Sequence, residues 1–195
     1  MIGSSVLDAL VASFLDQLAD AMRAGPGVSE VGRALAELAS QEKAFASLIE
    51  QIDPSQNGGF PLHVPEHGPR LFFLHRPRGV MSAIHTHNTW IAVACVRGVE
   101  THQTFEVASE EPPDRAVLVV SEERRLGPGE VVTLTPPRDI HSHGHRSGSG
   151  DTPYSLILTG DDQLRFARRE YDAAAGRYTA LGPGEFGTLN LPAES

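Results

Sequence analysis

The chain has 195 residues, a formal net charge of −9 at pH 7, nine histidines and one cysteine, Cys95. This length fits one ordinary domain, and a hydrophobic share of 40% is enough to fill a core, which excludes a disordered or collagen-like chain. An acidic surface repels phosphate, so we expect no nucleic-acid partner and no membrane. A single cysteine cannot form an internal disulfide, as is typical of a reducing compartment, and we expect a cytoplasmic protein.

The N-terminal part of the chain predicts helices. Apolar residues recur at intervals of three and four over residues 5–22 and again over residues 29–52, and this is the period of an amphipathic helix. Acidic residues interrupt the first stretch and no basic segment precedes it, so it predicts neither a signal peptide nor a membrane span. We expect residues 1–56 to form helices that pack on residues 57–195, the two parts making one structural unit.

Beyond these helices the pattern changes to short runs rich in Val, Phe, Thr and Leu, separated by Gly and Pro. Eight or nine such runs favour a small barrel or jelly roll that closes its own edges. The expected strands are residues 71–75, 81–87, 90–96, 100–107, 116–121, 131–134, 154–159, 164–171 and 178–181.

The histidines follow the strand pattern. His85 and His87 stand two residues apart on a predicted strand, so both side chains point to one face, where two imidazoles can bind one metal ion. A barrel can return a later histidine to the same place. His141, His143 and His145 alternate along the chain and could share a face, so more than one of them can be the third ligand.

Two groups of residues have the spacing of the two cupin motifs. The first group is Gly79, His85, His87 and Gly98, and the second is Pro136 with His141. The chain therefore resembles the cupin superfamily. This resemblance implies a mostly-β fold, the double-stranded β-helix or jelly-roll barrel, here preceded by two N-terminal helices. Ile91 stands where most cupins carry a metal-binding Glu.

Loss of that Glu marks the thiol dioxygenase branch, and four segments resemble cysteine dioxygenase and its bacterial relatives. These segments are residues 85–90, 96–100, 139–141 and 155–160. The resemblance implies a non-haem Fe(II) dioxygenase that acts on a small thiol or related chelating anion with O₂. It also implies Fe(II) held by His85, His87 and His141, with Zn, Ni and Mn as alternatives. Three neutral ligands leave the ion its full charge, which favours an anionic donor.

The expected substrate site departs from that family. Its pocket strand carries Ser, His and Tyr at alternate positions, which are Ser155, Ile157 and Thr159 in this chain. Ile157 cannot form a hydrogen bond and Thr159 is too short to replace a phenol. Arg76 falls where the resemblance puts a pocket aromatic, and its guanidinium could bind a carboxylate, although a surface salt bridge in the turn 75–78 is an equal alternative. We expect these four side chains to contact a substrate other than free cysteine.

Two further histidines are expected to support the ligands without binding the metal, namely His102 and His143. His102 shares a strand face with Glu100, and both could instead face solvent. Two other functions remain open. One is a cupin isomerase, lyase or hydrolase that uses Zn, Ni or Mn as a Lewis acid, and the other is a non-catalytic cupin that binds a small molecule. Assembly into a homo-oligomer also remains open.

Overall fold

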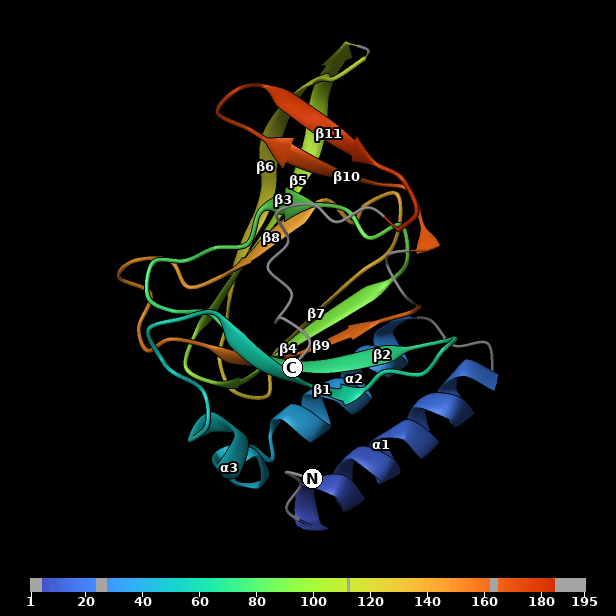
Figure 1. Ribbon diagram of the computed structural model, residues 1–195, viewed down its shortest axis with the longest axis vertical. Helices are drawn as coiled ribbons and strands as arrows, with labels where there is room; N and C mark the ends of the chain where they lie inside the picture. Colours follow the sequence, from blue (N-terminus) through green and yellow to red (C-terminus); the bar gives the residue numbers. More distant parts are fainter. Residues whose placement is uncertain (1–4, 24–27, 112, 162–164, 185–195) are drawn as a thin grey trace.

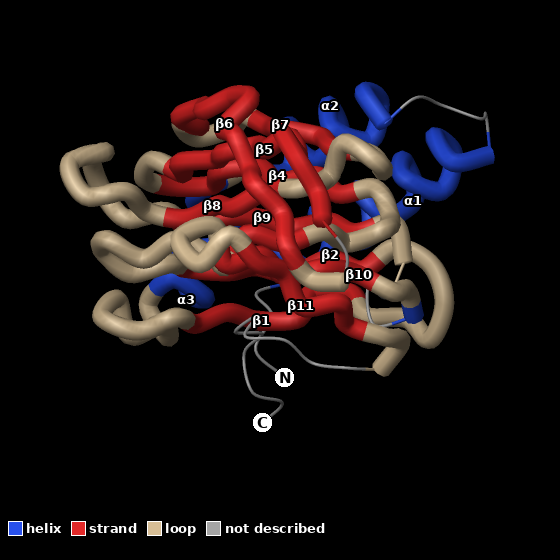
Figure 2. The backbone as a smooth tube through the Cα atoms, turned by 90° about the horizontal axis from the view of Figure 1, so that it is seen from above, coloured by secondary structure: helices blue, strands red, loops and turns tan. Residues whose placement is uncertain are grey.

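The computed structural model of the chain describes residues 5–23, 28–111, 113–161 and 165–184 (Figure 1). Helices occupy the N-terminal part and the strands follow, and Figure 2 shows more strand than helix. The helices are α1 (Ser5–Arg23), α2 (Val28–Ala39), the short 3₁₀ helix η1 (Glu42–Phe45) and α3 (Ala46–Ile49). The strands are β1 (Gly58–His63), β2 (Arg70–His75), β3 (Ile84–His85), β4 (Ile91–Arg97), β5 (Glu100–Glu111), β6 (Arg115–Leu126), β7 (Val131–Leu134), β8 (His141–Gly144), β9 (Tyr154–Thr159), β10 (Arg168–Asp172) and β11 (Arg177–Leu181).

The strands form two antiparallel sheets that face each other. The first sheet has the order β1-β2-β9-β4-β7, and the second contains β6-β5-β8-β3, closed into a barrel by the hairpin of β10 and β11. From β2 to β9 the chain passes repeatedly between the two sheets, because β2, β4, β7 and β9 belong to the first and β3, β5, β6 and β8 to the second. This winding is the jelly roll, or double-stranded β-helix, of cupins. The predicted fold class is confirmed.

The central strands of the first sheet, β4 and β9, are buried on both faces. Alternation along its strands sends one set of side chains outward to the helices, which lie beneath this sheet in Figure 1. Phe73 of β2 is fully buried there and its ring stacks on that of Phe45, with centroids 5.2 Å apart. Burial of such a side chain stabilises the fold by about 1.5–3 kcal/mol. The opposite face of the sheet points into the barrel.

The prediction of one continuous helix over residues 29–52 is wrong, because the helix is interrupted after Ala39. Helix α2 ends at Ala39, and the hydroxyl of Ser40 donates a hydrogen bond of 2.7 Å to the carbonyl of Glu37. A serine that bonds the preceding turn competes with the helical ladder. The chain then continues as η1 and α3, which keep Phe45 and Leu48 in the core. The apolar period therefore indicated burial but not an unbroken helix.

The sequence did not predict two of the strands, β1 and β8. Strand β8 has the sequence His-Ser-His-Gly, so its buried positions are polar and give no apolar alternation. The expected strand 81–87 shrinks to Ile84–His85, and the expected strand 164–171 begins at Arg168, with Leu164 outside the described residues. No helix among the described residues combines the length and the apolar composition that crossing a membrane requires.

Candidate metal centre

Three histidines from neighbouring strands meet inside the barrel. Strands β3 and β8 pair with His85 directly opposite His141, and His87 follows two residues after His85. Each of the three offers one ring nitrogen, and these atoms all lie within 4.8 Å of one another. The Nε2 atoms of His85 and His87 are 2.9 Å apart. All three side chains are buried, and among the described residues this is the one cluster of potential ligands with such spacing.

Carbonyl groups fix the orientation of two of these rings. The Nδ1 atom of His85 lies 2.8 Å from the carbonyl oxygen of Ala83, and that of His141 lies 2.8 Å from the carbonyl oxygen of Asp139. Because a carbonyl only accepts, each Nδ1 carries the proton and each Nε2 keeps its lone pair. The Nε2 of His141 is buried without a hydrogen-bond partner. Lone pairs aimed at one point from buried nitrogens are what a divalent metal ion would bind.

The three imidazoles are held in their neutral form. Burial lowers the pKa of His85 and of His87 well below the ordinary value and also lowers the pKa of His141, because the interior disfavours the charged ring. The neighbouring histidines lower the first two pKa values further. A neutral imidazole is the form that binds metals, so these residues fit the predicted metal ion at neutral pH.

The carboxylate of Asp139 joins the two segments that carry the ligands. It accepts hydrogen bonds of 2.9 Å from the backbone N–H groups of both His87 and Asn88. Asp139 is 1% exposed, and Asn88 adopts a left-handed backbone with φ 53°. Sequence reasoning assigned Asp139 no role, since nothing in its spacing relates it to residues 52 and 51 positions earlier.

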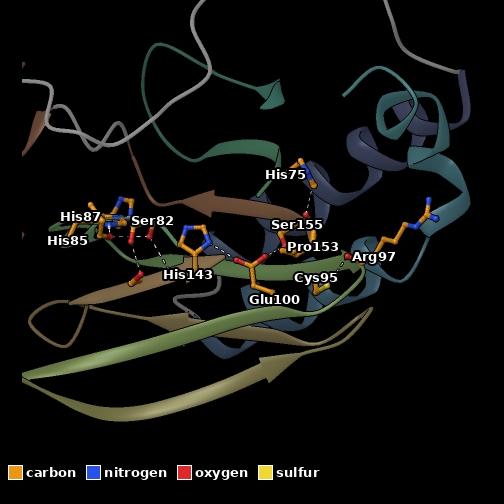
Figure 3. Close-up of polar contacts among 12 residues, drawn as sticks. His75, Ser82, His85, His87, Cys95, Arg97, Glu100, His143, Pro153 and Ser155 are labelled. Atoms are coloured by element: carbon orange, nitrogen blue, oxygen red, sulfur yellow. Dashed lines mark hydrogen bonds and ion pairs between the residues drawn. The ribbon is translucent and has the colours of Figure 1, made fainter. Parts of the chain in front are cut away.

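A chain of hydrogen bonds lies beside the histidine cluster. Figure 3 shows His143 between the His85–His87 pair and Glu100, with Ser155 on the far side of Glu100. The Nδ1 of His143 is 2.6 Å from one carboxylate oxygen of Glu100, and the hydroxyl of Ser155 donates to the other. Burial raises the pKa of Glu100 to about 7, against the opposing effects of Ser155 and Arg76. The sequence placed Glu100 and His102 on one strand face, either near the metal or facing solvent, and both are buried, at 1% exposed.

The remaining histidines take different places. The ring of His102 stacks almost parallel on that of His141, with centroids 5.3 Å apart, and His143 lies 5.7 Å from His141 by the same measure. Both are buried beside the cluster but are not among its three members. His145 binds the backbone at both ring nitrogens, accepting from the N–H of Gly79 and donating to the carbonyl of Gly150. Of the three alternating histidines, His141 is therefore the one that joins the cluster.

The predicted substrate residues lie on or near the inner face of the first sheet. Ile157 belongs to an apolar cluster, Ser155 bonds Glu100, and the hydroxyl of Thr159 donates a 3.0 Å bond to the carbonyl of Asp161. Arg76 is 9% exposed, which does not fit a surface salt bridge, and burial lowers its pKa while the nearby Glu100 opposes this shift. The apolar cluster consists of Leu74, Ile91, Val93, Cys95, Leu126, Val132 and Ile157.

No protein-family model matches the chain, and no curated protein matches it in sequence. Similar solved structures include a cupin superfamily protein from Desulfitobacterium hafniense DCB-2, with 12% identity, a TM-score of 0.40 and coverage of 56% of this chain and 81% of the other. A cupin-like protein from Thermotoga maritima MSB8 has 15% identity and a TM-score of 0.40 over 65% of this chain and 77% of its own. The DMSP lyase DddQ from Ruegeria pomeroyi DSS-3 has 19% identity and a TM-score of 0.38 over 58% of this chain and 50% of its own.

Proposed function

We propose that the chain is a non-haem metal-dependent dioxygenase that uses O₂ and acts on a small thiol or a related chelating anion. The observation that carries this proposal is the convergence of three buried neutral imidazoles, from His85, His87 and His141. Imidazole donors suit Fe, Zn and Ni, and a set without a carboxylate leaves the ion a charge that attracts an anionic ligand. Fe(II), when bound there, would supply the redox chemistry that O₂ requires. Zn, Ni and Mn are the alternative ions, and Zn, which has no redox chemistry, would act as a Lewis acid.

Arg76 supports a substrate that also carries a carboxylate. Its guanidinium is buried on the side of the barrel where it acts electrostatically on His85, His143 and Glu100, and its Nε has no hydrogen-bond partner. A buried guanidinium binds a carboxylate through two parallel hydrogen bonds. The inner face of the first sheet is apolar around Ile157, and this surface would contact the carbon chain of the substrate. We therefore propose a short mercapto acid as the substrate class.

Oxygen uptake tests this function. The protein is loaded with Fe(II) without oxygen and then given O₂ with 3-mercaptopropionate, cysteine, cysteamine or propanethiol. We expect uptake with 3-mercaptopropionate to exceed uptake with the two thiols that lack a carboxylate. Arg76→Leu should raise the KM for 3-mercaptopropionate by about 10- to 100-fold, the usual effect of losing a charged hydrogen bond in a site, and should leave propanethiol unaffected. Absence of uptake with every thiol would contradict the proposal.

Glu100 favours a second candidate, a metal-assisted lyase or isomerase in which this carboxyl moves a proton to or from the substrate. The group is buried in the barrel between His143 and Ser155. Burial raises the pKa of Glu100 to about 7, which suits a general acid or base near neutral pH. Zinc-loaded protein that exchanges a substrate C–H bond with D₂O, consumes no O₂ and loses this exchange in Glu100→Gln would favour this candidate over the dioxygenase.

A further inference from the structure

The histidine pair of the metal centre has little strand structure to hold it. Strand β3 contains only Ile84 and His85, so His87 and Asn88 lie beyond the end of the ladder. Their backbone N–H groups therefore lack the partners that a longer strand would give them. A buried backbone donor needs an acceptor, since leaving it unpaired costs free energy.

Asp139 supplies that acceptor from a distant part of the chain. One oxygen of its carboxylate receives the N–H groups of both His87 and Asn88, each at 2.9 Å. Bonds from N–H groups to a carboxylate are stronger than those to a carbonyl. The carbonyl group of the same residue orients His141 through its Nδ1, at 2.8 Å. One residue thus contacts the segments that provide two of the three ligands.

The other side of this segment is bound to β10. The N–H of Thr86 donates to the carbonyl of Arg169 at 3.0 Å, and the N–H of Arg169 donates to the hydroxyl of Thr86 at 2.9 Å. The side-chain amide of Asn88 donates to the carbonyl of Ala167. These bonds hold residues 86–88 against β10. The Asp139 carboxylate holds them near the segment that leads into β8.

We propose that Asp139 is a positioning residue of the metal centre, which holds His87 at the distance from His141 that metal binding requires. This inference rests on the three-histidine centre of the proposed function but not on its reaction. It differs from a general structural role because Asp139 acts on the ligand geometry, so its loss should weaken metal binding in protein that is still folded. Loss of a partner that orients a ligand typically lowers metal affinity 10- to 100-fold.

Co(II) binding to the full chain, followed by visible absorption without oxygen or substrate, tests this role. We expect Asp139→Ala to weaken Co(II) binding 10- to 100-fold and to change the ligand-field spectrum of the bound ion. Asp139→Asn keeps an oxygen acceptor for both N–H groups, and we expect it to restore most of the affinity. Asp172→Ala is the matched control, because that carboxylate accepts the backbone N–H of Ala175 at 3.0 Å in the β10–β11 turn. This control should leave the affinity unchanged.

Unfolding of the metal-free variants separates positioning from stability. If Asp139→Ala lowers the thermal stability of the metal-free protein but the folded fraction binds Co(II) as tightly as wild type, the proposal is overturned. It is also overturned if Asp139→Asn binds no better than Asp139→Ala while both remain folded. Wild-type protein that binds no Co(II) would contradict the metal centre and the proposed function together. Normal metal behaviour without O₂ uptake would contradict the proposed function alone.

Discussion

The two walls of the barrel interior differ in chemistry although the same alternation of strand residues builds both. The wall from the first sheet is apolar, with Ile91, Val93 and Ile157 packed together. The wall from the second sheet carries His85, His141, His143, His102 and Glu100. Apolar burial contributes about 25 cal/mol per Å², whereas buried polar groups cost free energy unless they are partnered. Apolar burial, which stabilises the fold, is thus concentrated in the first sheet. The buried polar groups of the candidate metal centre lie on the second.

The largest expected effect is the loss of the metal from the histidine wall. His141→Ala removes an Nε2 that is buried without a hydrogen-bond partner, and we expect it to abolish metal binding. His143→Ala is the control on the same strand, and it should keep most of the metal because His143 bonds Glu100 instead. Metal analysis after dialysis measures both. Loss of the metal in His143→Ala but not in His141→Ala would show that the wrong histidine is assigned as ligand.

A change in the apolar wall should affect stability and leave the metal in place. Ile91 is 1% exposed, so Ile91→Ala removes buried methyl and methylene groups and leaves a cavity. We expect a loss of about 2–5 kcal/mol in the free energy of unfolding. Urea unfolding measures this loss, and Co(II) titration of the folded protein should give the wild-type affinity. If Ile91→Ala lowered the Co(II) affinity as well as the free energy of unfolding, the two walls would not have the separate roles assigned to them.

Acid should destabilise the metal-free protein through the histidine wall. Burial lowers the pKa of His102 well below its ordinary value. Below about pH 6.5 the unfolded chain binds a proton at this ring and the folded chain does not, so stability falls as the pH falls. His102→Leu should reduce this slope by up to about 1.4 kcal/mol per pH unit. Urea unfolding at several pH values between roughly 7.5 and 5.5 measures how the free energy of unfolding depends on pH. An unchanged slope of stability against pH in His102→Leu would mean that burial of His102 is not the cause of the acid sensitivity.

The smallest effect concerns Cys95, which lies in the apolar wall. Burial, with Glu100 nearby, raises the pKa of this thiol to about 12, so almost no reactive thiolate exists at neutral pH. We expect a disulfide reagent to label Cys95 only as fast as the protein unfolds. Labelling in native buffer and in urea measures this difference. Rapid labelling of the native protein would mean that the wall is open to solvent.

The same contrast explains what the sequence could predict. Strand β4 is apolar on both faces, because one face meets the helices and the other the barrel interior, and β9 is apolar on its helix face. Both strands were predicted within a residue or two. Strand β8 was missed because His141 and His143 occupy its inward positions. The clustering of His85, His87 and His141 was predictable, since their spacing resembles the cupin motifs and does not depend on an apolar pattern.

Contacts between residues far apart in the sequence could not be predicted. Glu100 meets His143 and Ser155 over 43 and 55 residues, and Asp139 meets His87 over 52 residues. The Glu100–Ser155 pair joins the two sheets, whereas the other two pairs join neighbouring strand segments of the second sheet, and no local pattern contains either kind of pairing. The break at Ser40 was missed for a different reason, because one hydroxyl bond to the carbonyl of Glu37 interrupts an otherwise helical period.

The two-residue length of β3 also has a consequence for dynamics. Segments with few ladder bonds open locally at a lower free energy than the global unfolding of the molecule, and amide hydrogen exchange reports this difference. Strand β3 pairs with β8 and β10, but beyond its two residues the N–H groups of His87 and Asn88 depend on the Asp139 carboxylate, whereas β4 lies between β7 and β9. Amides of β4 should therefore exchange slowly and those of His87 and Asn88 quickly. An ion could then enter or leave by a local opening of this segment while the rest of the barrel stays folded.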